Sequence, residues 1–474
     1  FLPWLFCKSN IRLLQTVYYK KVQEECLELA KDPQKRLLLL QNLQELPSDM
    51  SIMVIASLPQ PIHVELTNLE NSRIEYRARE AWKKRIYGHG KDSKRKLDEI
   101  FRLPLKNISL DHLYALLNYS TLDRNDNLEL KDKLFGILRS LPTDLSFVSL
   151  ADNGLKEENR KDLKNALSRF TLLKGLDLHF NWLKEKSIQR LGRMSLTSLT
   201  LLDLGQNDIG DEGIEAVLQS KYLTSLKSLS LEHCGITSKD DFKTIRALTE
   251  RPHSTSLTFL DLKDNYMHGN VFKVFNQSPY LKFLTTLRLV RCALGSEIDL
   301  RDLARGSAIP ALKNLDLGEN RMEKAGNALR ETHFSLVYLG LAENNMGVGS
   351  LSSLLENTRL ENLEHFELQK NKLGNEGMEK LGTCPFLTSL KSLDIQENDI
   401  GLRGIQYIVQ SPYLTALTSL NFYDNVSERD VEAARDLISQ NSTLKSLKNW
   451  RVTITDQFNH YAVRYPFFPD YIPE

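Results

Sequence analysis

The sequence predicts an α/β solenoid in which short parallel strands alternate with helices, preceded by a separate helical region. Three observations predict it. The pattern L-x-x-L-x-L-x-x-N returns eleven times from about residue 145. A stretch with helical apolar spacing follows the strand pattern, as at residues 210–218. Residues 1–104 do not follow the repeat at all.

The repeat returns about every 27 residues, which is a typical length for a strand-plus-helix coil. Its last position is Asn or Cys, at Asn153, Asn181, Asn207, Cys234, Asn265, Cys292, Asn320, Asn344, Asn371, Asn398 and Asn425. A buried amide there can bond free backbone groups of neighbouring coils, and Cys can replace it as a small buried donor. No coil buries both its faces, so we expect stability to come from stacking on neighbours.

One unit, residues 199–218, illustrates the roles of the positions. The side chains expected to point inward are Leu199, Leu202 and Leu204 on the strand and Ile214, Val217 and Leu218 on the helix. Gly210 is expected to permit the turn between them, and Asp211 to cap the helix N-terminus.

This pattern resembles the ribonuclease-inhibitor-like class of leucine-rich repeats over roughly residues 145–450. The phrases NDIGDEG (207–213) and NKLGNEG (371–377), and the SPYL linkers, look like those of long bacterial repeat proteins, which include secreted effectors. The resemblance implies a horseshoe with a parallel sheet on its concave side and helices outside. It also implies that the protein binds another protein rather than carrying out chemistry.

Strand positions between and after the inward leucines are expected to face the concave surface, and the residues inside each L-x-L form a mostly acidic column. A second acidic column lies just before the Asn position, at Asp152, Asp264, Glu319, Glu343, Glu397 and Asp424. These columns suggest a cradle for a basic partner. The alternative is that acidic residues at these positions are common in this repeat class whatever it binds.

Departures from the repeat consensus point to a contact site for a protein partner. Arg288, Val290 and Arg291 interrupt the acidic columns in the middle of the array, and large aromatics are expected on the open face. Arg and aromatic side chains are enriched in binding hot spots, although isolated exposed aromatics are also common. The candidate partner-binding residues are Phe147, Phe180, Phe259, Arg288, Arg291, Asp316, Tyr338 and Tyr423.

The region before the repeats contains a partial resemblance to an F-box, a helical module that docks substrate receptors onto the Skp adaptor of cullin ubiquitin ligases. The matching features are an opening Leu-Pro, a short helix ending in Leu about twelve residues later, and a late Trp-Lys-Lys. By position, the residues that the resemblance places against the adaptor are Leu46, Pro47, Ile55, Leu58 and Trp82. The region lacks the family's earlier aromatic, and Pro59 and Pro61 interrupt it. The alternative is a helical cap over the open end of the solenoid core.

The expected organisation is a helical region over 1–104, F-box-like at about 45–86, a degenerate first repeat over 105–144, the array over 145–450 and a C-terminal cap over 451–474. The role expected for the whole is a non-enzymatic interaction protein, and the more specific expectation is an effector-type F-box substrate receptor for a cullin ubiquitin ligase. The alternative is a sequestering inhibitor or scaffold without a link to a ligase.

Composition argues against several other classes of function. The chain has 62 Lys and Arg against 61 Asp and Glu, so no global field favours nucleic acid. Its five cysteines are scattered, which predicts a reduced protein that is cytoplasmic or is secreted into a host cytosol. No apolar run approaches the roughly 18 residues of a membrane span, so we expect no membrane partner.

Motifs for catalysis, metals and cofactors fail on their spacing. GHGKDSK lacks the Gly and the Ser/Thr of a phosphate loop, and DRNDNLEL has Leu128 where a calcium loop needs Gly. None of the cysteines is followed two residues later by the Asp of bacterial leucine-rich-repeat ligases. We therefore expect neither a cofactor nor a metal, and no enzymatic activity.

Overall fold

The computed structural model describes Phe135, Thr143 and residues 147–151, 154–237, 239–250, 256–267, 271–295, 297–439 and 449–451. They fall in two compact units, which we describe separately. The first contains the chain up to Leu183 and residues 194–199, and the second contains residues 184–193 and the chain from Thr200. The F-box-like residues Leu46, Pro47, Ile55, Leu58 and Trp82 lie outside the described residues.

In the first unit, two short strands pair in parallel and one helix follows the first of them. β1 (Phe147–Ser149) pairs with β2 (Gly175–Asp177), with Val148 opposite Leu176. Between them lie the 3-10 helix η2 (Glu157–Asn159) and α9 (Arg160–Leu167). These elements have the strand–helix–strand order that the repeat pattern predicts.

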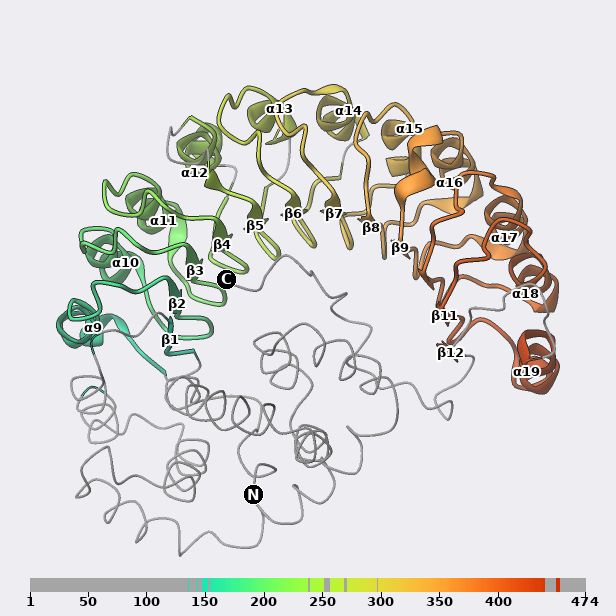
Figure 1. The fold of residues 1–474 in the computed structure, drawn as a ribbon, viewed down its shortest axis with the longest axis horizontal. Coiled ribbons are helices and arrows are strands. Elements are labelled where there is room, and N and C mark those ends of the chain that lie inside the picture. The colour runs from blue at the N-terminus through green and yellow to red at the C-terminus, as the bar shows by residue number, and fades with distance from the viewer. Residues whose placement is uncertain are drawn as a thin grey trace, which may run out of the picture. The chain divides into compact units, whose positions relative to one another are not determined.

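The second unit contains ten parallel strands in sequence order (Figure 1). Each strand is three residues long, and its first, middle and last residues lie opposite the matching residues of the next strand. The strands are β3 (Leu201–Asp203), β4 (Ser228–Ser230), β5 (Phe259–Asp261), β6 (Thr286–Arg288), β7 (Asn314–Asp316), β8 (Tyr338–Gly340), β9 (His365–Glu367), β10 (Ser392–Asp394), β11 (Ser419–Asn421) and β12 (Asn449–Arg451).

Helices alternate with these strands and line the outer side of the curve that the second unit forms in Figure 1. They are α10 (Glu185–Leu191), α11 (Gly210–Leu218), α12 (Lys239–Thr249), α13 (Val271–Asn276), α14 (Glu297–Arg305), α15 (Ala325–Leu329), α16 (Gly347–Leu355), α17 (Gly374–Thr383), α18 (Leu402–Val409) and α19 (Val431–Ser439), with 3-10 helices η4 (Thr358–Asn362) and η5 (Glu428–Asp430). The predicted α/β solenoid, with a parallel sheet inside and helices outside, is confirmed.

The core lies between the sheet and the helices, because alternation along each strand buries its middle residue. All six side chains predicted to point inward in the unit at 199–218 are buried. Gly210 turns the chain with φ of +76°, which favours glycine, as the sequence indicates.

The predicted cap at Asp211 is wrong. Asp211 lies inside α11, whose N-cap is Ile209. Its carboxylate instead accepts hydrogen bonds from the next repeat, from Oγ1 of Thr237 at 2.8 Å and Oγ1 of Thr244 at 2.5 Å. The acid therefore joins two coils rather than ending one helix.

Among the helices that the structure describes, none is both long enough and apolar enough to cross a lipid bilayer.

Candidate functional site

A ladder of buried side chains joins successive repeats and holds the strands in register. Asn371 shows the pattern. Its Nδ2 donates to the carbonyls of Leu341 in the preceding repeat at 2.8 Å and of Leu368 in its own at 2.9 Å. Its Oδ1 accepts the backbone N–H groups of Asn344 and Met346 at 3.1 Å each. A buried amide thus satisfies backbone groups that the turns leave without partners.

Two cysteines keep the donor half of this role. Sγ of Cys234 donates to the carbonyl of Leu204 at 3.3 Å, and Sγ of Cys292 donates to that of Leu262 at 3.2 Å. Burial raises the pKa of Cys292 to about 12, so the thiol keeps its proton. The predicted replacement of Asn by Cys as a buried donor is confirmed. Both thiols are structural, because a buried neutral thiol is a poor nucleophile.

The residues before and after each buried middle residue lie on the open, concave side of the sheet. The last residues of strands β3 to β11 form one column: Asp203, Ser230, Asp261, Arg288, Asp316, Gly340, Glu367, Asp394 and Asn421. We call this set the acidic column. A single Arg stands among its carboxylates.

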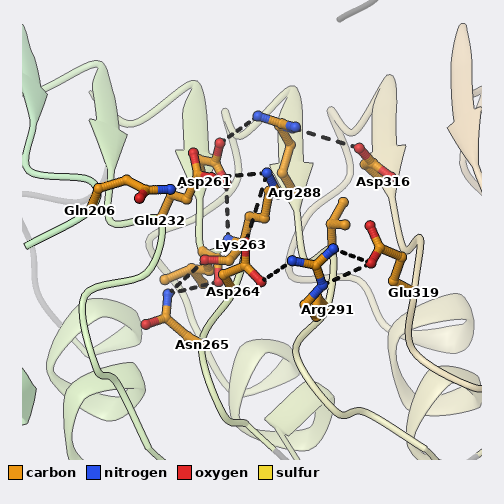
Figure 2. Close-up of polar contacts among 12 residues, drawn as sticks. Gln206, Glu232, Asp261, Lys263, Asp264, Asn265, Arg288, Arg291, Asp316 and Glu319 are labelled. Carbon is orange, nitrogen blue, oxygen red and sulfur yellow. Dashed lines mark hydrogen bonds and ion pairs between the residues drawn. The ribbon is translucent and has the colours of Figure 1, made fainter. Parts of the chain in front are cut away.

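Arg288 bridges the two acids beside it in this column (Figure 2). Its Nη1 lies 2.6 Å from Oδ2 of Asp261, and its Nε lies 3.6 Å from Oδ2 of Asp316. The Arg288 side chain is only 11% exposed. The guanidinium is therefore part of the sheet surface, held between strands β5 and β7.

Burial shifts the pKa values of Asp261, Asp316 and Arg288. It raises the pKa of Asp261 to about 6, although Arg288 opposes the rise. It raises the pKa of Asp316 as well, again against the effect of Arg288. Burial alone would lower the pKa of Arg288, but Asp261 and Asp316 raise it above its usual value. The guanidinium of Arg288 therefore keeps its positive charge at neutral pH.

A second set of charges lies in the turns just before the ladder position, where the backbone has positive φ. Arg291 contacts Asp264 at 3.0 Å and donates from Nε to Glu319 at 2.8 Å (Figure 2). Three repeats later Lys370 pairs with Glu343 at 2.8 Å and with Glu397 at 3.8 Å. Each base thus lies between two acids from neighbouring repeats. We call these six residues the turn ladder.

A lysine and a glutamate connect the turn ladder to the neighbouring repeat. Nζ of Lys263 lies 2.9 Å from Oε1 of Glu232 and 3.8 Å from Oδ2 of Asp264. Glu232 also accepts a hydrogen bond from Nε2 of Gln206 at 3.3 Å (Figure 2). Each residue follows the second Leu of its L-x-L motif, a position that the sequence places on the concave face, but the spacing does not indicate that the two residues pair.

Tyr338 and Gly340 are the first and last residues of β8, and the Tyr338 hydroxyl lies over Gly340. A Cβ built on Gly340 would lie 2.5 Å from Oδ1 of Asp316 and 2.8 Å from the Tyr338 hydroxyl. The hydroxyl forms a hydrogen bond with the carboxyl of Glu367. Burial, followed by the charges of Asp316 and Asp394, raises the pKa of Glu367 to about 8.

The structure changes the interpretation of two predicted contact residues. Arg288 is held internally by two carboxylates, and Tyr338, expected as an exposed aromatic, is only 3% exposed. Both are buried because neighbouring strands bring their polar partners into reach. Arg291 is 58% exposed, but it is paired with Asp264 and Glu319. Asp316 is likewise buried beneath this network.

The remaining predicted aromatics differ in exposure. Phe180 in the first unit is exposed and stacks on His179 with ring centroids 6.3 Å apart. Phe259 begins β5 and is half-buried beside its strand neighbours Ser228 and Thr286. Tyr423 is also half-buried, two residues after β11. Phe147 begins β1, and its side chain lies outside the described part of the chain. Phe259 and Tyr423 therefore remain candidates for contact on the second unit.

Within the described ranges, no three His, Cys, Asp or Glu side chains are placed to hold a metal ion.

Comparison with known proteins identifies the repeats. Residues 195–218, 222–240, 359–382 and 386–409 match a family model described as Leucine Rich repeat. These segments are leucine-rich repeats. The fold of this chain is accordingly a leucine-rich-repeat solenoid, as its strand-and-helix order indicates.

Many solved structures are similar to this chain, and two of them illustrate the likeness. One is an internalin from Listeria monocytogenes, 17% identical, with a TM-score of 0.37, covering 67% of this chain and 88% of that one. The other is the complex of Rad7 and Elc1 in yeast, 18% identical, with a TM-score of 0.47, covering 66% of this chain and 77% of that one. The search of curated proteins found no match.

Proposed function

We propose that this leucine-rich-repeat protein is a non-enzymatic binding protein whose concave face, from β3 to β11, contacts a protein partner. One observation supports the proposal most strongly. The sheet presents two in-register rows of concave positions, mostly polar, across nine consecutive strands, and the buried ladder joins these strands. At roughly 4.8 Å per strand these rows extend about 40 Å, enough for a folded domain or a helix.

The charge of this face favours a partner with a basic contact surface. In the acidic column, Arg288 balances one of its two neighbours, and Asp203 and Asp394 add further carboxyl groups on either side. Phe259 and Tyr423 add partly exposed aromatic area at two separate strands. Aromatic anchors surrounded by polar groups are typical of protein interfaces.

The test compares concave and convex variants of the full chain in quantitative affinity capture from cell lysate. The concave variant combines Phe259→Ala with Tyr423→Ala. The matched control is Glu376→Lys, an exposed change on α17 on the outer side. Proteins retained by wild type and control but lost by the concave variant support the proposal. Equal retention by the concave variant would overturn it, provided that circular dichroism shows an intact fold.

The more specific form of the proposal is a substrate receptor that recruits a ubiquitin ligase. It rests on the F-box-like residues Leu46, Pro47 and Trp82, which lie outside the described residues. Direct binding to purified Skp adaptor is the test, with Leu46→Ala/Pro47→Ala as the variant. Binding that the double substitution abolishes supports a receptor. If the intact chain does not bind the adaptor, the receptor hypothesis is wrong. The alternative is then a sequestering inhibitor or scaffold with a helical cap.

A further inference from the structure

We propose that the turn ladder, together with the next residue of its row, Asp424, is a docking edge for an extended segment of a protein partner that carries two basic side chains four residues apart. This inference rests on the proposed function, because it names the chemistry of a segment that would bind beside the concave face. It places the charged contacts on the turns that follow the strands, and not on the acidic column of the sheet.

The backbone of the turns arranges this row of side chains. Each residue of the turn ladder, and Asp424 after it, has a left-handed conformation with φ between 50° and 59°. Neighbouring turns are joined in the same way each time. The N–H of Glu319 donates to the Ala342 carbonyl at 2.7 Å, and the N–H of Glu397 donates to the Tyr423 carbonyl at 3.0 Å. Because conformation and bonding repeat, successive side chains of the row follow one another at about the spacing of the strands.

Charges alternate along this row except at two places. In strand order the row reads acid, base, acid, acid, base, acid, acid: Asp264, Arg291, Glu319, Glu343, Lys370, Glu397 and Asp424. Each base contacts the acid on either side of it. In this described row, no base stands between Glu319 and Glu343, a place that we call the first gap. The second gap is the place between Glu397 and Asp424.

Both gaps are open to a positively charged group from outside. The side chains of Glu319, Glu343 and Glu397 are 29%, 40% and 36% exposed. Asp424 is exposed as well. Like charges at adjacent positions repel each other, whereas a cation between them is attracted by both. A basic side chain in each gap would therefore make the alternation of charge continuous along the row.

A different observation supports a cation at each gap. The N–H of Glu343 donates to the carbonyl of Gln369 at 2.9 Å, so Gln369 lies next to the first gap. Oε1 of Gln369 is buried and accepts no hydrogen bond from the described residues. An ammonium or guanidinium group brings several N–H donors to such an acceptor. At the second gap, the half-buried Tyr423 directly precedes Asp424, and an aromatic ring attracts a cation to its face.

The distance between the gaps favours an extended segment over a helix. The first gap follows β7 and β8, and the second follows β10 and β11. At roughly 4.8 Å per strand they are about 14 Å apart. Residues four apart in an extended chain have this separation and share one face. In an α-helix about nine residues are needed, which puts the two side chains on opposite faces.

The partner segment should therefore have Lys or Arg at positions i and i+4. Its residue i+2 would lie opposite Lys370, which stands midway between the gaps. Lys370 repels a third cation, so we expect an uncharged or acidic residue at i+2.

Two synthetic peptides and the purified full chain test the inference. One peptide has Lys at i and i+4 among serines, and the other has the same composition with its two lysines adjacent. Fluorescence anisotropy of the labelled peptides at low salt measures their affinities. The spaced peptide should bind about fivefold more tightly or better, because it alone fills both gaps. Equal affinities, tighter binding of the adjacent pair, or no binding of either peptide would overturn the inference.

Variants of the chain locate the contact. Glu319→Gln combined with Glu343→Gln removes the first gap, so the spaced peptide should bind no more tightly than the adjacent one. The matched control is Glu361→Gln with Glu376→Gln, which removes two charges at exposed positions outside the row. The control should keep the preference for the spaced peptide. An equal loss in both double variants, with folds that circular dichroism shows to be intact, would mean that only net charge attracts the peptide and would contradict the docking edge.

These outcomes are separable from the test of the proposed function, which changes Phe259 and Tyr423 and no acid of the first gap. If the peptides fail while capture of partners still depends on Phe259 and Tyr423, the docking edge is wrong and the proposed function stands. If the spaced peptide binds as expected while capture does not depend on these aromatics, the docking edge stands and the concave sheet is not the contact surface.

Discussion

The backbone N–H of Cys292 donates to Oδ1 of Asn320 in the next repeat at 2.8 Å. The amide of Asn320 in turn donates to the Leu289 carbonyl of the preceding repeat at 2.7 Å. Each ladder side chain therefore serves two coils. Replacement of one such side chain is therefore expected to destabilise both coils.

Asn371→Ala should lower the free energy of unfolding by about 3 kcal/mol, because several buried backbone groups lose their partners. Urea denaturation followed by circular dichroism measures the change. The control is Asn362→Ala, which removes one exposed hydrogen bond to Ser335 at 2.8 Å. A loss at Asn371 no larger than that of the control would show that water replaces the amide.

Arg288→Ala should be strongly destabilising, by about 3 kcal/mol, because it leaves Asp261 and Asp316 buried without their cation. Without Arg288 the pKa of both acids should rise further, so the loss should be greater at pH 8 than at pH 5. Urea midpoints at the two pH values measure this difference. Adding Asp261→Asn to Arg288→Ala should recover part of the stability, and no recovery would argue against the bridge.

Arg291→Ala should change the free energy of unfolding by about 0.5 kcal/mol or less, although Arg291 has as many ion-pair partners as Arg288. Its side chain is exposed, so water and salt screen both pairs. Thermal unfolding at low and high salt is the measurement. A loss of stability comparable to that of Arg288→Ala would mean that the difference in exposure does not decide how much each arginine stabilises the fold.

Gly340→Ala should destabilise the protein by about 1–3 kcal/mol, because the new methyl group would overlap Asp316 and the Tyr338 hydroxyl. Gly349→Ala is the matched control, because nothing lies within 4 Å of a Cβ at that helical position. Alanine there should be neutral or slightly stabilising. Equal stability of both variants, measured in urea, would show that Tyr338 moves aside without cost.

The fold could be predicted from the sequence because its signal repeats. Asn371 and Cys292 stand at the same point of the repeat, and their buried bonds follow from that position. Asp211 could not be assigned in this way, since its partners Thr237 and Thr244 belong to the next coil. The preference of Asp for helix N-termini suggested that Asp211 is a cap, whereas its contacts with the next coil determine its role.

The site was harder to predict than the scaffold. Sequence spacing placed Arg288 and Tyr338 on the concave face, and the structure places their strands there. Their burial depends on which side chains stand on the adjacent strands, and in particular on the missing side chain of Gly340. That information is distributed over repeats about 27 residues apart. The ligase hypothesis depends on residues 46–82 and stays a prediction.

The ladder described above also has a mechanical consequence. From Asn320 to Asn425 an amide links every coil to the next, whereas Cys234 and Cys292 keep the donor half of the link. Bending of the second unit should therefore concentrate at the link between Asn207 and Cys234 and at the link between Asn265 and Cys292, leaving the stretch beyond Asn320 comparatively stiff. A partner bound to the concave face would meet the more flexible links toward its N-terminal side and a stiffer surface on the C-terminal side.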